Sequence, residues 1–212
     1  WRHGIIEPDC CDIDVAALHQ AYLGRAARLG TAMAMRSALS SARFSNGRWT
    51  IRHGTSESTA AILVNAAGAW ADHVAAMAGL EPLGLSPLRR TVAQLRVAPA
   101  VPADLPLVLD VNETFYFKPE AGRLWLSPHD ETPSPPCDAA AEELDVALAL
   151  DRMARVVDWR IEAVERRWAG LRTFAPDRLP VYGRDPHKPQ FFWFAGQGGF
   201  GIQTAPAAAQ LG

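Results

Sequence analysis

A glycine-rich run near the end of the chain has residue types and spacing that suit ligand binding. Residues 196–201 read Gly-Gln-Gly-Gly-Phe-Gly, the pattern G-x-G-x-x-G, and they follow the apolar run Phe191–Ala195. Glycine adopts positive φ angles and lets the backbone approach a ligand closely. Unpaired N–H groups at a helix start attract anions and electron-rich carbonyl groups. We therefore predict a strand over 191–195, a ligand-binding loop, and a helix that begins near Ile202.

Two other interpretations of this loop follow from its residues. A glycine-rich turn that only packs a helix against a sheet has the same composition, and this alternative stays open. A dinucleotide fingerprint also requires an acidic residue about 20 positions further on, within a βαβ unit. The sequence ends at Gly212, before that position, which disfavours NAD binding through residues 196–201.

A second candidate ligand site follows the apolar run Ala61–Asn65. Such a continuous run is typical of a strand in a covered parallel sheet. The small residues of 66–69 come directly after it, and ligands of open α/β sheets bind at the carboxyl ends of strands. Close packing of a helix on the strand also needs small residues and is the alternative.

The elements that must position these loops follow from periodicity and turn residues. We expect helices from Asp12 or Asp14 to Leu29, from about residue 70 to Ala78, and over 138–159. We expect strands over 1–6, 31–36, 38–44, 48–52, 61–65, 90–97, 107–110, 114–118 and 123–127, and a return segment over 162–172. Asn46-Gly47 predicts a tight hairpin.

Composition indicates a globular chain without a polyanionic partner. Of the 212 residues, 49% are hydrophobic and 21% are charged, and the net charge is −2. This charge gives no electrostatic footprint for nucleic acid or an anionic membrane, and no apolar run approaches the roughly 20 residues that span a bilayer. The three cysteines form no C-x-x-C pattern, so we expect a reducing, cytoplasmic setting. The polar triplet 129–131 has no supporting ligand cluster, so we expect a solvated loop and no metal site.

Composition changes at Glu81–Pro87, which predicts a domain boundary. The middle region has hairpin connections and therefore a largely antiparallel sheet. We expect residues 1–80 and 165–212 to form one domain, with 1–6 as a strand that could belong to the other, and 81–164 to form an inserted domain.

Several motifs resemble one known family. Residues 65–72 (NAAGAWAD), 170–183 (GLRTFAPDRLPVYG) and 195–202 (AGQGGFGI) are similar, in this order, to segments of FAD-dependent amine and amino-acid oxidoreductases. These are the relatives of D-amino-acid oxidase, glycine oxidase and sarcosine oxidase, and residues 12–14 and 115–119 fit as well. The resemblance implies an α+β or α/β fold. The chain would form part of a glutathione-reductase-like, FAD-binding α/β domain, and a largely antiparallel substrate-binding domain would be inserted in it.

One part of the family pattern has no counterpart in this sequence. The family begins with a strand, a G-x-G-x-x-G turn, a helix and a later acidic residue, which together hold the FAD pyrophosphate and ribose. We therefore expect the chain to be a fragment that lacks the N-terminal dinucleotide-binding segment.

The resemblance implies a carboxylate-binding role for two side chains. Arg172 matches the arginine that holds the substrate carboxylate, and its guanidinium fork suits two parallel hydrogen bonds. Tyr116 matches a tyrosine whose hydroxyl donates to the same carboxylate. The alternatives are a surface arginine and an ordinary strand aromatic.

The resemblance also implies a non-covalent FAD site, because no cysteine lies near Gly170. Backbone N–H groups of the glycine loop would stabilise negative charge near flavin N1 and O2. Leu39 matches a residue whose backbone contacts adenine. The implied cofactor-binding residues are Leu39, Ala66, Ala67, Gly68, Trp70, Gly196, Gly198, Gly199, Phe200, Gly201 and Ile202.

The implied function is oxidation of the C–N bond of an amino acid or N-methyl amino acid, with hydride transfer to flavin N5 and hydrolysis of the imine. The partner would be a small amino acid or amine carboxylate, with no nucleic acid and no membrane, and the alanine-rich helices are compatible with a homo-oligomer. One alternative is a related dehydrogenase or one module of a bifunctional enzyme. Another is a truncated, non-catalytic fragment that does not retain FAD.

Overall fold

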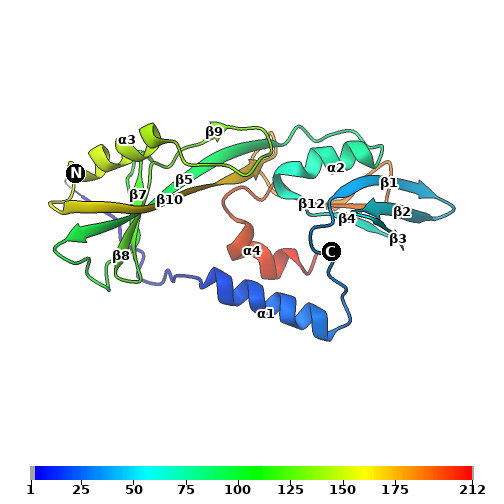
Figure 1. The fold of residues 1–212 in the computed structure, drawn as a ribbon, viewed down its shortest axis with the longest axis horizontal. Helices are drawn as coiled ribbons and strands as arrows, with labels where there is room; N and C mark the ends of the chain where they lie inside the picture. Colours follow the sequence, from blue (N-terminus) through cyan, green and yellow to red (C-terminus); the bar gives the residue numbers. More distant parts are fainter. Residues whose placement is uncertain (1–2, 212) are drawn as a thin grey trace. The chain divides into compact units, whose positions relative to one another are not determined.

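The computed structural model describes residues 3–211 and divides the chain into two compact units (Figure 1). The first unit comprises Trp1–Gly84 and Arg178–Gly212, and the second comprises Leu85–Asp177. Residues 165–177, which the sequence analysis grouped with the outer segments, belong to the second unit, and 165–174 lie in its long strand β10 (Arg160–Phe174). None of the helices within residues 3–211 is long and apolar enough to cross a membrane.

The first helix of the chain, α1 (Val15–Arg28), begins and ends as expected from the sequence. Asp14 is its N-cap residue, and the Asp14 carboxylate accepts a hydrogen bond of 2.9 Å from the Ala17 N–H, which satisfies one of the free donors of the first turn. The strands expected over 31–36 and 3–6 are absent, so these predictions are wrong, whereas residues 1–2 lie outside the described residues. Arg36 has a φ of 54°, which is incompatible with an extended strand.

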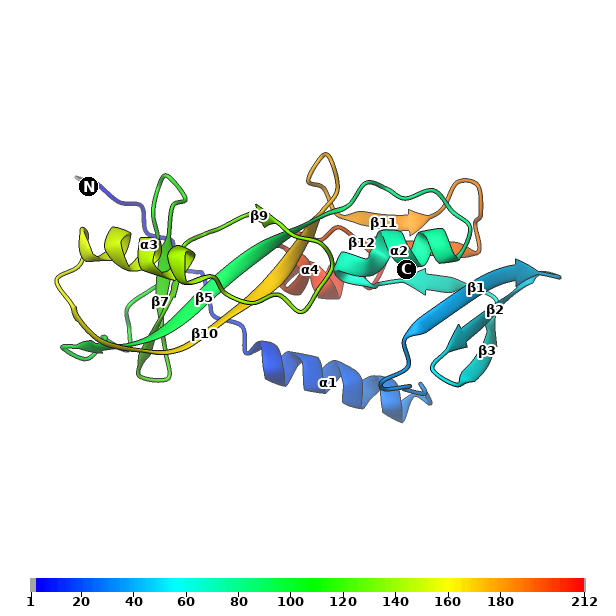
Figure 2. The ribbon, with the colours of Figure 1, turned by 45° about the horizontal axis from the view of Figure 1, so that its top comes forward.

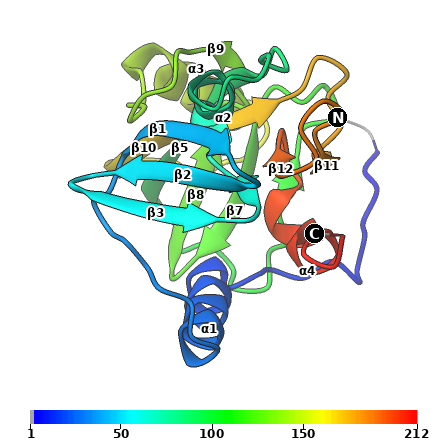
Figure 3. The same cartoon turned by 90° about the vertical axis from the view of Figure 1, so that its right-hand side faces the viewer.

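Three antiparallel strands follow in the first unit, seen in Figure 3: β1 (Leu39–Ser45), β2 (Arg48–His53) and β3 (Ser56–Ala60). Asn46 and Gly47 have φ values of 50° and 77°, as a two-residue hairpin turn requires. The sequence analysis missed β3, because Ser56-Glu57-Ser58-Thr59 has no apolar face to signal a strand.

A second small sheet in this unit has the order β11-β12-β4. β12 (Phe191–Ala195) pairs in parallel with β4 (Leu63–Asn65) and antiparallel with β11 (Val181–Arg184). Phe191 and Trp193 are buried, and Phe191 packs against Trp49 of β2 with ring centroids 6.0 Å apart. The short 3₁₀ helix η1 (Gly68–Trp70) and α2 (Ala71–Met77) follow β4, and α4 (Gly201–Ala208) follows β12.

The second unit is built on a six-stranded antiparallel sheet, which confirms the expected inserted sheet. Its main path runs β10-β5-β8-β7-β6, with β9 paired to β5, and Figure 2 shows the long β5 and β10 side by side. The strands are β5 (Ser86–Ala98), β6 (Val108–Leu109), β7 (Tyr116–Glu120), β8 (Arg123–Ser127), β9 (Thr132–Pro133) and β10 (Arg160–Phe174).

One face of this sheet carries the hydrophobic core of the second unit. Leu95 of β5 and Leu124 and Leu126 of β8 are fully buried. They cluster with Val146 and Met153 of the helix α3 (Glu143–Ala154). Helix α3 (Glu143–Ala154) is shorter than the 138–159 expected. The residues after it lead directly into β10, whose ladder with β5 begins at Arg160.

Candidate functional site

The two loops predicted to bind a cofactor lie at one edge of the β11-β12-β4 sheet. Strands β4 and β12 are parallel, and Asn65 near the end of β4 lies opposite Trp193 of β12. Their carboxyl ends therefore point the same way, so the loops that begin at Ala66 and at Gly196 emerge at the same edge. This is where ligands bind in open α/β sheets.

The backbone of both loops requires glycine. Gly68, Gly196 and Gly198 have φ values of 55°, 70° and 55°, a region that other residues adopt only with strain. A Cβ atom added at Gly68 would meet no other atom within 4 Å, so the space beside this glycine is open. At Gly68 the first loop therefore combines a positive φ angle with open space beside the backbone.

The start of α4 has donors that no side chain caps. The first N–H groups of a helix have no partner within the helix and carry its positive dipole end. Gly201 begins this helix, and the N–H of Thr204 is the first to bond back, to the Phe200 carbonyl at 3.1 Å. The N–H of Phe200 itself donates to the Gln197 carbonyl at 3.0 Å. This N–H is therefore not free to bind a cofactor, in contrast to the expectation from the sequence.

Asn65 organises the first of these loops, and the sequence analysis assigned it no role. Its side chain is buried, with 1% of its surface exposed. The amide donates to the Ala71 carbonyl at 2.8 Å and accepts from the Ala67 N–H at 3.3 Å. A polar amide at the end of an apolar run was the available signal, since such a group needs partners when buried.

The remaining predicted cofactor residues lie in different surroundings of the first unit. Trp70 is half-exposed in η1, and Leu39 lies at the start of β1 in the other sheet. A groove of about 430 Å³ also opens on this unit, and of the predicted residues only Ala66 lines it. The other lining residues are Ile62, Val64, Arg184, Phe192, Phe194 and Ala209.

In the second unit, Arg172 shares a sheet face with Arg90. Residues directly opposite each other on neighbouring strands point to the same face, as do residues two apart along one strand. Arg172 lies opposite Leu88, and Arg90 lies opposite Gly170. The two arginines are therefore diagonal neighbours across β5 and β10, with backbones about 7–8 Å apart.

Tyr116 lies on this same face. Gln94 follows Arg90 at an even spacing along β5 and lies opposite Trp125 of β8. Ser127, two residues after Trp125, lies opposite Tyr116 of β7. The face opposite the α3 core thus carries Arg172, Arg90 and Tyr116 on β10, β5 and β7. The two predicted carboxylate-binding residues therefore share this face with Arg90, which the sequence analysis did not select, and β5 and β8 lie between their strands.

Arg90 is a buried cation with incomplete hydrogen bonding. Its side chain is 6% exposed, its Nε donates to the Asp130 carbonyl at 2.8 Å, and its Nη2 lies 3.2 Å from a carboxylate oxygen of Glu131. Its Nη1 is buried without a hydrogen-bond partner among the described residues. Burial lowers the pKa of the Arg90 guanidinium and the Arg172 charge lowers it further, whereas Tyr116, Glu131 and Asp130 raise it.

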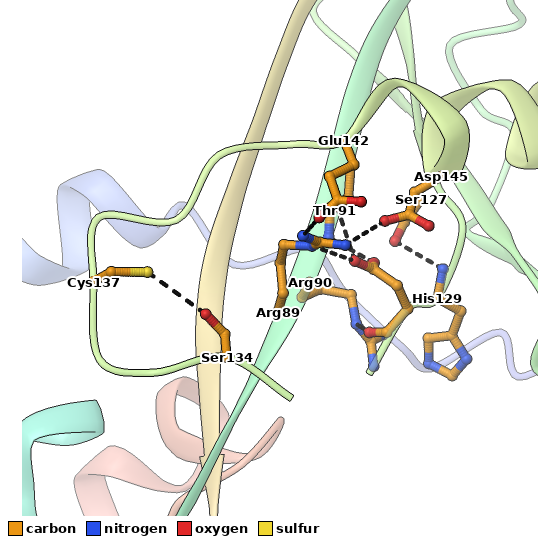
Figure 4. A network of polar contacts seen from close by, with 10 residues as sticks. Arg89, Arg90, Thr91, Ser127, His129, Ser134, Cys137, Glu142 and Asp145 are labelled. Atoms are coloured by element: carbon orange, nitrogen blue, oxygen red, sulfur yellow. Dashed lines mark hydrogen bonds and ion pairs between the residues drawn. The ribbon is translucent and has the colours of Figure 1, made fainter. Parts of the chain in front are cut away.

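Asp130 anchors its loop to Arg89, Arg90 and Thr91, the three neighbouring β5 residues that are labelled in Figure 4. Its carboxylate accepts from the N–H and hydroxyl of Thr91 at 2.7 and 2.8 Å and lies 3.6 Å from Arg89. Arg89 also pairs with Glu142 and, at 2.7 Å, with Asp145. The expectation of a solvated loop over 129–131 is therefore wrong at Asp130, because it supplies the acceptors that the β5 backbone needs.

His129, on the same loop, packs against Tyr116. The two rings meet edge to face with centroids 5.6 Å apart, and the His129 Nδ1–H donates to the Glu113 carbonyl at 2.6 Å. Within residues 3–211, no cluster of three or more His, Cys, Asp or Glu residues could hold a metal ion. His129 therefore links the Tyr116 ring to the backbone at Glu113.

The fold of this chain is similar to that of several solved enzymes. Glycine oxidase from Geobacillus kaustophilus is 26% identical, with a TM-score of 0.76, over 92% of this chain and 51% of that chain. L-proline dehydrogenase from P. horikoshii is 20% identical with a TM-score of 0.78, over 90% of this chain and 52% of that one. Iminodiacetate oxidase from Chelativorans sp. BNC1 is 20% identical with a TM-score of 0.70, over 92% of this chain and 52% of that chain. The last two similarities show a shared fold.

This chain spans about half the length of these solved relatives. Residues 1–211 match the sequence pattern of the family described as FAD dependent oxidoreductase (DAO). The match extends over both units, so it includes the glycine loops and the sheet face of Arg172. The chain belongs to the FAD dependent oxidoreductase family.

Proposed function

We propose that the protein oxidises the C–N bond of an amino acid or N-methyl amino acid of the glycine, sarcosine or D-amino-acid type. One observation carries this proposal. The half-buried Arg172 side chain has no ion pair or hydrogen bond among residues 3–211, and it shares a sheet face with Tyr116. A cation held in this way suits an external carboxylate. The similarity to a glycine oxidase supports the same substrate class.

Arg172 and Tyr116 would bind and orient the substrate. The guanidinium fork pairs with a carboxylate in two parallel hydrogen bonds, and the Tyr116 hydroxyl donates a third. His129 packs edge-on against the Tyr116 ring and holds it in place. Fixing the carboxylate restricts the position of the α-carbon, which lowers the entropic cost of the reaction.

The first unit would hold FAD through its two glycine loops. Gly68, Gly196 and Gly198 allow close approach of the backbone, and the uncapped N–H groups at the start of α4 would interact with an electron-rich edge of the cofactor. When bound, FAD supplies the two-electron acceptor for the reaction.

The overall change in the substrate is balanced without a catalytic acid from this chain. The carbon attached to nitrogen would lose a hydride, for which bound FAD would supply the acceptor, and the nitrogen would lose a proton to solvent as the C=N bond forms. Water then adds to the imine carbon, and the C–N bond breaks to give a carbonyl compound and ammonia or a primary amine. Arg172 contributes by keeping the substrate in place while its amine is neutral.

The test uses the full-length, flavin-loaded protein. Under exclusion of oxygen, glycine, sarcosine or D-alanine should bleach the visible flavin band, and simple amines without a carboxylate should do so poorly. Arg172→Ala should raise KM for the carboxylates about 100-fold, the loss of a charge-assisted pair of hydrogen bonds. Arg160→Ala, which removes a largely exposed arginine of the same strand, is the matched control and should change little. The proposal fails if no carboxylated amine reduces the flavin, or if Arg172→Ala weakens amines and amino acids equally.

A further inference from the structure

The proposed reaction requires a neutral substrate amine, and the two carboxylate-binding side chains do not provide one. An alkylamine has a pKa of about 10.4, so an amino acid reaches the protein mainly as an ammonium ion. The nitrogen of an ammonium ion has no lone pair, which hydride loss from the neighbouring carbon needs. Arg172 has donors only, and the Tyr116 hydroxyl would donate to the carboxylate. A proton acceptor beside Tyr116 would therefore speed the reaction.

His129 has a lone pair in this position. Its ring meets the Tyr116 ring edge to face, with centroids 5.6 Å apart. Its Nδ1 lies 2.6 Å from the Glu113 carbonyl oxygen, and a carbonyl oxygen only accepts hydrogen bonds, so Nδ1 carries the ring proton. In a neutral imidazole the other nitrogen, Nε2, is then the acceptor.

The Nε2 atom of His129 is not used by the fold. Among residues 3–211, His129 makes its hydrogen bonds through its backbone N–H, to the Ser127 hydroxyl at 3.1 Å, and through Nδ1. The residue is partly exposed, and Nε2 does not belong to the buried polar atoms that lack a partner. A ligand or a water molecule can therefore reach it.

The backbone holds His129 in an unfavourable conformation. Its φ is 56°, in the left-handed region that is costly for residues with a Cβ atom, and such conformations cluster at functional sites. The next residue fixes the loop in this shape, because the Asp130 carboxylate accepts from the Thr91 N–H at 2.7 Å and its carbonyl accepts from Arg90 at 2.8 Å. The position of the ring is therefore set by β5.

The elements packed against His129 carry charges of both signs. The charged and titratable groups are Asp110, Asp130, Glu131, Arg90, Arg152 and the Tyr116 hydroxyl. Asp130 lies 3.6 Å from Arg89, Glu131 lies 3.2 Å from Arg90, and the Arg152 charge acts on Asp110. Because each carboxylate has an arginine beside it, the neutral imidazole is the better proton acceptor in this group.

We propose that His129 is the base that accepts the proton of the substrate ammonium group. This inference rests on the proposed function and adds a proton acceptor to it. The amino group is attached to the carbon that bears the carboxylate, so a substrate held by Tyr116 brings its nitrogen close to the neighbouring ring. The N–H bond breaks, its electron pair stays on the substrate nitrogen, and the proton bonds to Nε2. The imidazolium then releases this proton to solvent.

The first experiment replaces the nitrogens of the ring and keeps its packing. His129→Phe retains an aromatic ring beside Tyr116, and the full-length, flavin-loaded protein is reduced by glycine, sarcosine or D-alanine without oxygen. At about pH 7 we expect the second-order rate constant of flavin reduction to fall about 100-fold, as for the loss of a general base. In this variant the rate constant should rise about 10-fold per pH unit, as the fraction of neutral amine does. It should come within about 3-fold of the wild-type value near pH 10.

A second variant tests whether an added base restores the reaction. His129→Gly removes the ring, and glycine adopts the φ of 56° without strain. Added imidazole should raise the rate of flavin reduction in this variant at least about 10-fold at about pH 7, and it should not change the wild-type rate. His19→Gln is the matched control, because His19 is an exposed histidine of α1. This control should keep the wild-type rate and should not respond to imidazole.

The outcomes distinguish this inference from the proposed function. A His129→Phe variant that reduces its flavin at the wild-type rate would show that the ring only packs, and would overturn the role of His129 alone. A loss of equal size at every pH, without rescue of His129→Gly by imidazole, would do the same. The wild-type protein decides if neither variant folds: a rate that rises about 10-fold per pH unit between about pH 7 and 9 would show that it uses only the neutral amine from solution. Absence of flavin reduction by every carboxylated amine would overturn the proposed function itself.

Discussion

At the scale of single residues, the two faces of the sheet in the second unit carry different kinds of side chain. Leu95, Leu124 and Leu126 fill the opposite face, whereas Arg172, Arg90 and Tyr116 project from strands that the same core holds rigid. Rigid strands place such groups more accurately than loops do.

Tyr116 allows a narrow test of its hydroxyl. Tyr116→Phe removes the hydrogen-bond donor and keeps the ring that packs against His129 at 5.6 Å. We expect KM for amino acids to rise about 5–10-fold, the cost of one hydrogen bond to a charged group, with little change in thermal stability. Steady-state kinetics and a thermal melt check this. Unchanged KM would mean that the hydroxyl does not contact the carboxylate.

At the scale of elements, the parallel pairing of β4 and β12 is what brings two distant loops to one edge. β4 has only three residues, and it is followed at once by the loop that Asn65 holds. The parallel pairing of β4 with β12 determines at which edge the two loops emerge. The positive φ angles of Gly68, Gly196 and Gly198 determine the backbone conformation of these loops.

Glycine at position 68 should matter for cofactor binding more than for folding. Gly68→Ala places a Cβ in open space at a φ of 55°, with a strain of about 1–2 kcal/mol. We expect the full-length protein to bind FAD about 10-fold more weakly, measured by flavin fluorescence. Gly24→Ala is the control, because Gly24 lies within α1, where alanine should stabilise the helix by about 0.5–1 kcal/mol and leave FAD affinity unchanged. Equal affinities for all three proteins would contradict the loop assignment.

Asn65 should be important for stability. Asn65→Ala leaves the Ala71 carbonyl and the Ala67 N–H without their partner, at a cost of about 2–3 kcal/mol for buried polar groups. Chemical denaturation of the wild-type and variant proteins measures this loss. Asn65→Asp is a useful second variant, since it keeps the acceptor for Ala67 and loses the donor to Ala71. A stability loss as small as that of a surface substitution would show that the two bonds do not hold the loop.

At the scale of the whole molecule, the two units carry separate parts of the proposed chemistry. The first has the glycine loops and the uncapped start of α4, and the second has the carboxylate-binding face. The cytoplasmic location and the homo-oligomeric state remain predictions from the sequence.

Both units should lose stability in acid. Hydrogen bonding from the Thr114 side chain lowers the pKa of Asp110 in the second unit. Burial raises the pKa of Asp185 in the first unit, but hydrogen bonds from Trp193 and from backbone N–H groups outweigh it and leave this pKa below its ordinary value. Because the unfolded chain has Asp pKa values near about 3.9, this stabilisation is present above about pH 4 and is lost as the pH falls through the lower folded values.

The expected result is a melting temperature that falls as the pH is lowered from about 5 to about 2. Asp185→Asn cannot be protonated in this range, so its melting temperature should be lower at neutral pH and should depend less on pH than that of the wild-type protein. Thermal unfolding followed by circular dichroism at a series of pH values measures both. Identical pH dependence in the two proteins would show that Asp185 does not carry the effect.

The sequence by itself determined the local features of this protein. The hairpin at Asn46-Gly47, the capped helix after Asp14 and the strand-loop-helix around residues 191–208 each follow from neighbouring residues. Motifs in the right order also indicated the family, because the similarity of short segments can be seen without a fold. Local patterns gave a wrong prediction in two places. The polar residues of β3 gave no strand signal, and the pattern over residues 31–36 predicted a strand that the structure does not contain.

Only the tertiary structure decided which residues share a face. Arg90 and Arg172 are far apart in the chain, and their neighbourhood results from the antiparallel register of β5 and β10. A shift of one residue in that register would move Arg90 to the core face. Pairing between distant strands depends on the packing of the whole unit, so no local pattern marks it. For the same reason the buried nitrogen of Arg90 that has no hydrogen-bond partner among the described residues became visible only in the folded chain.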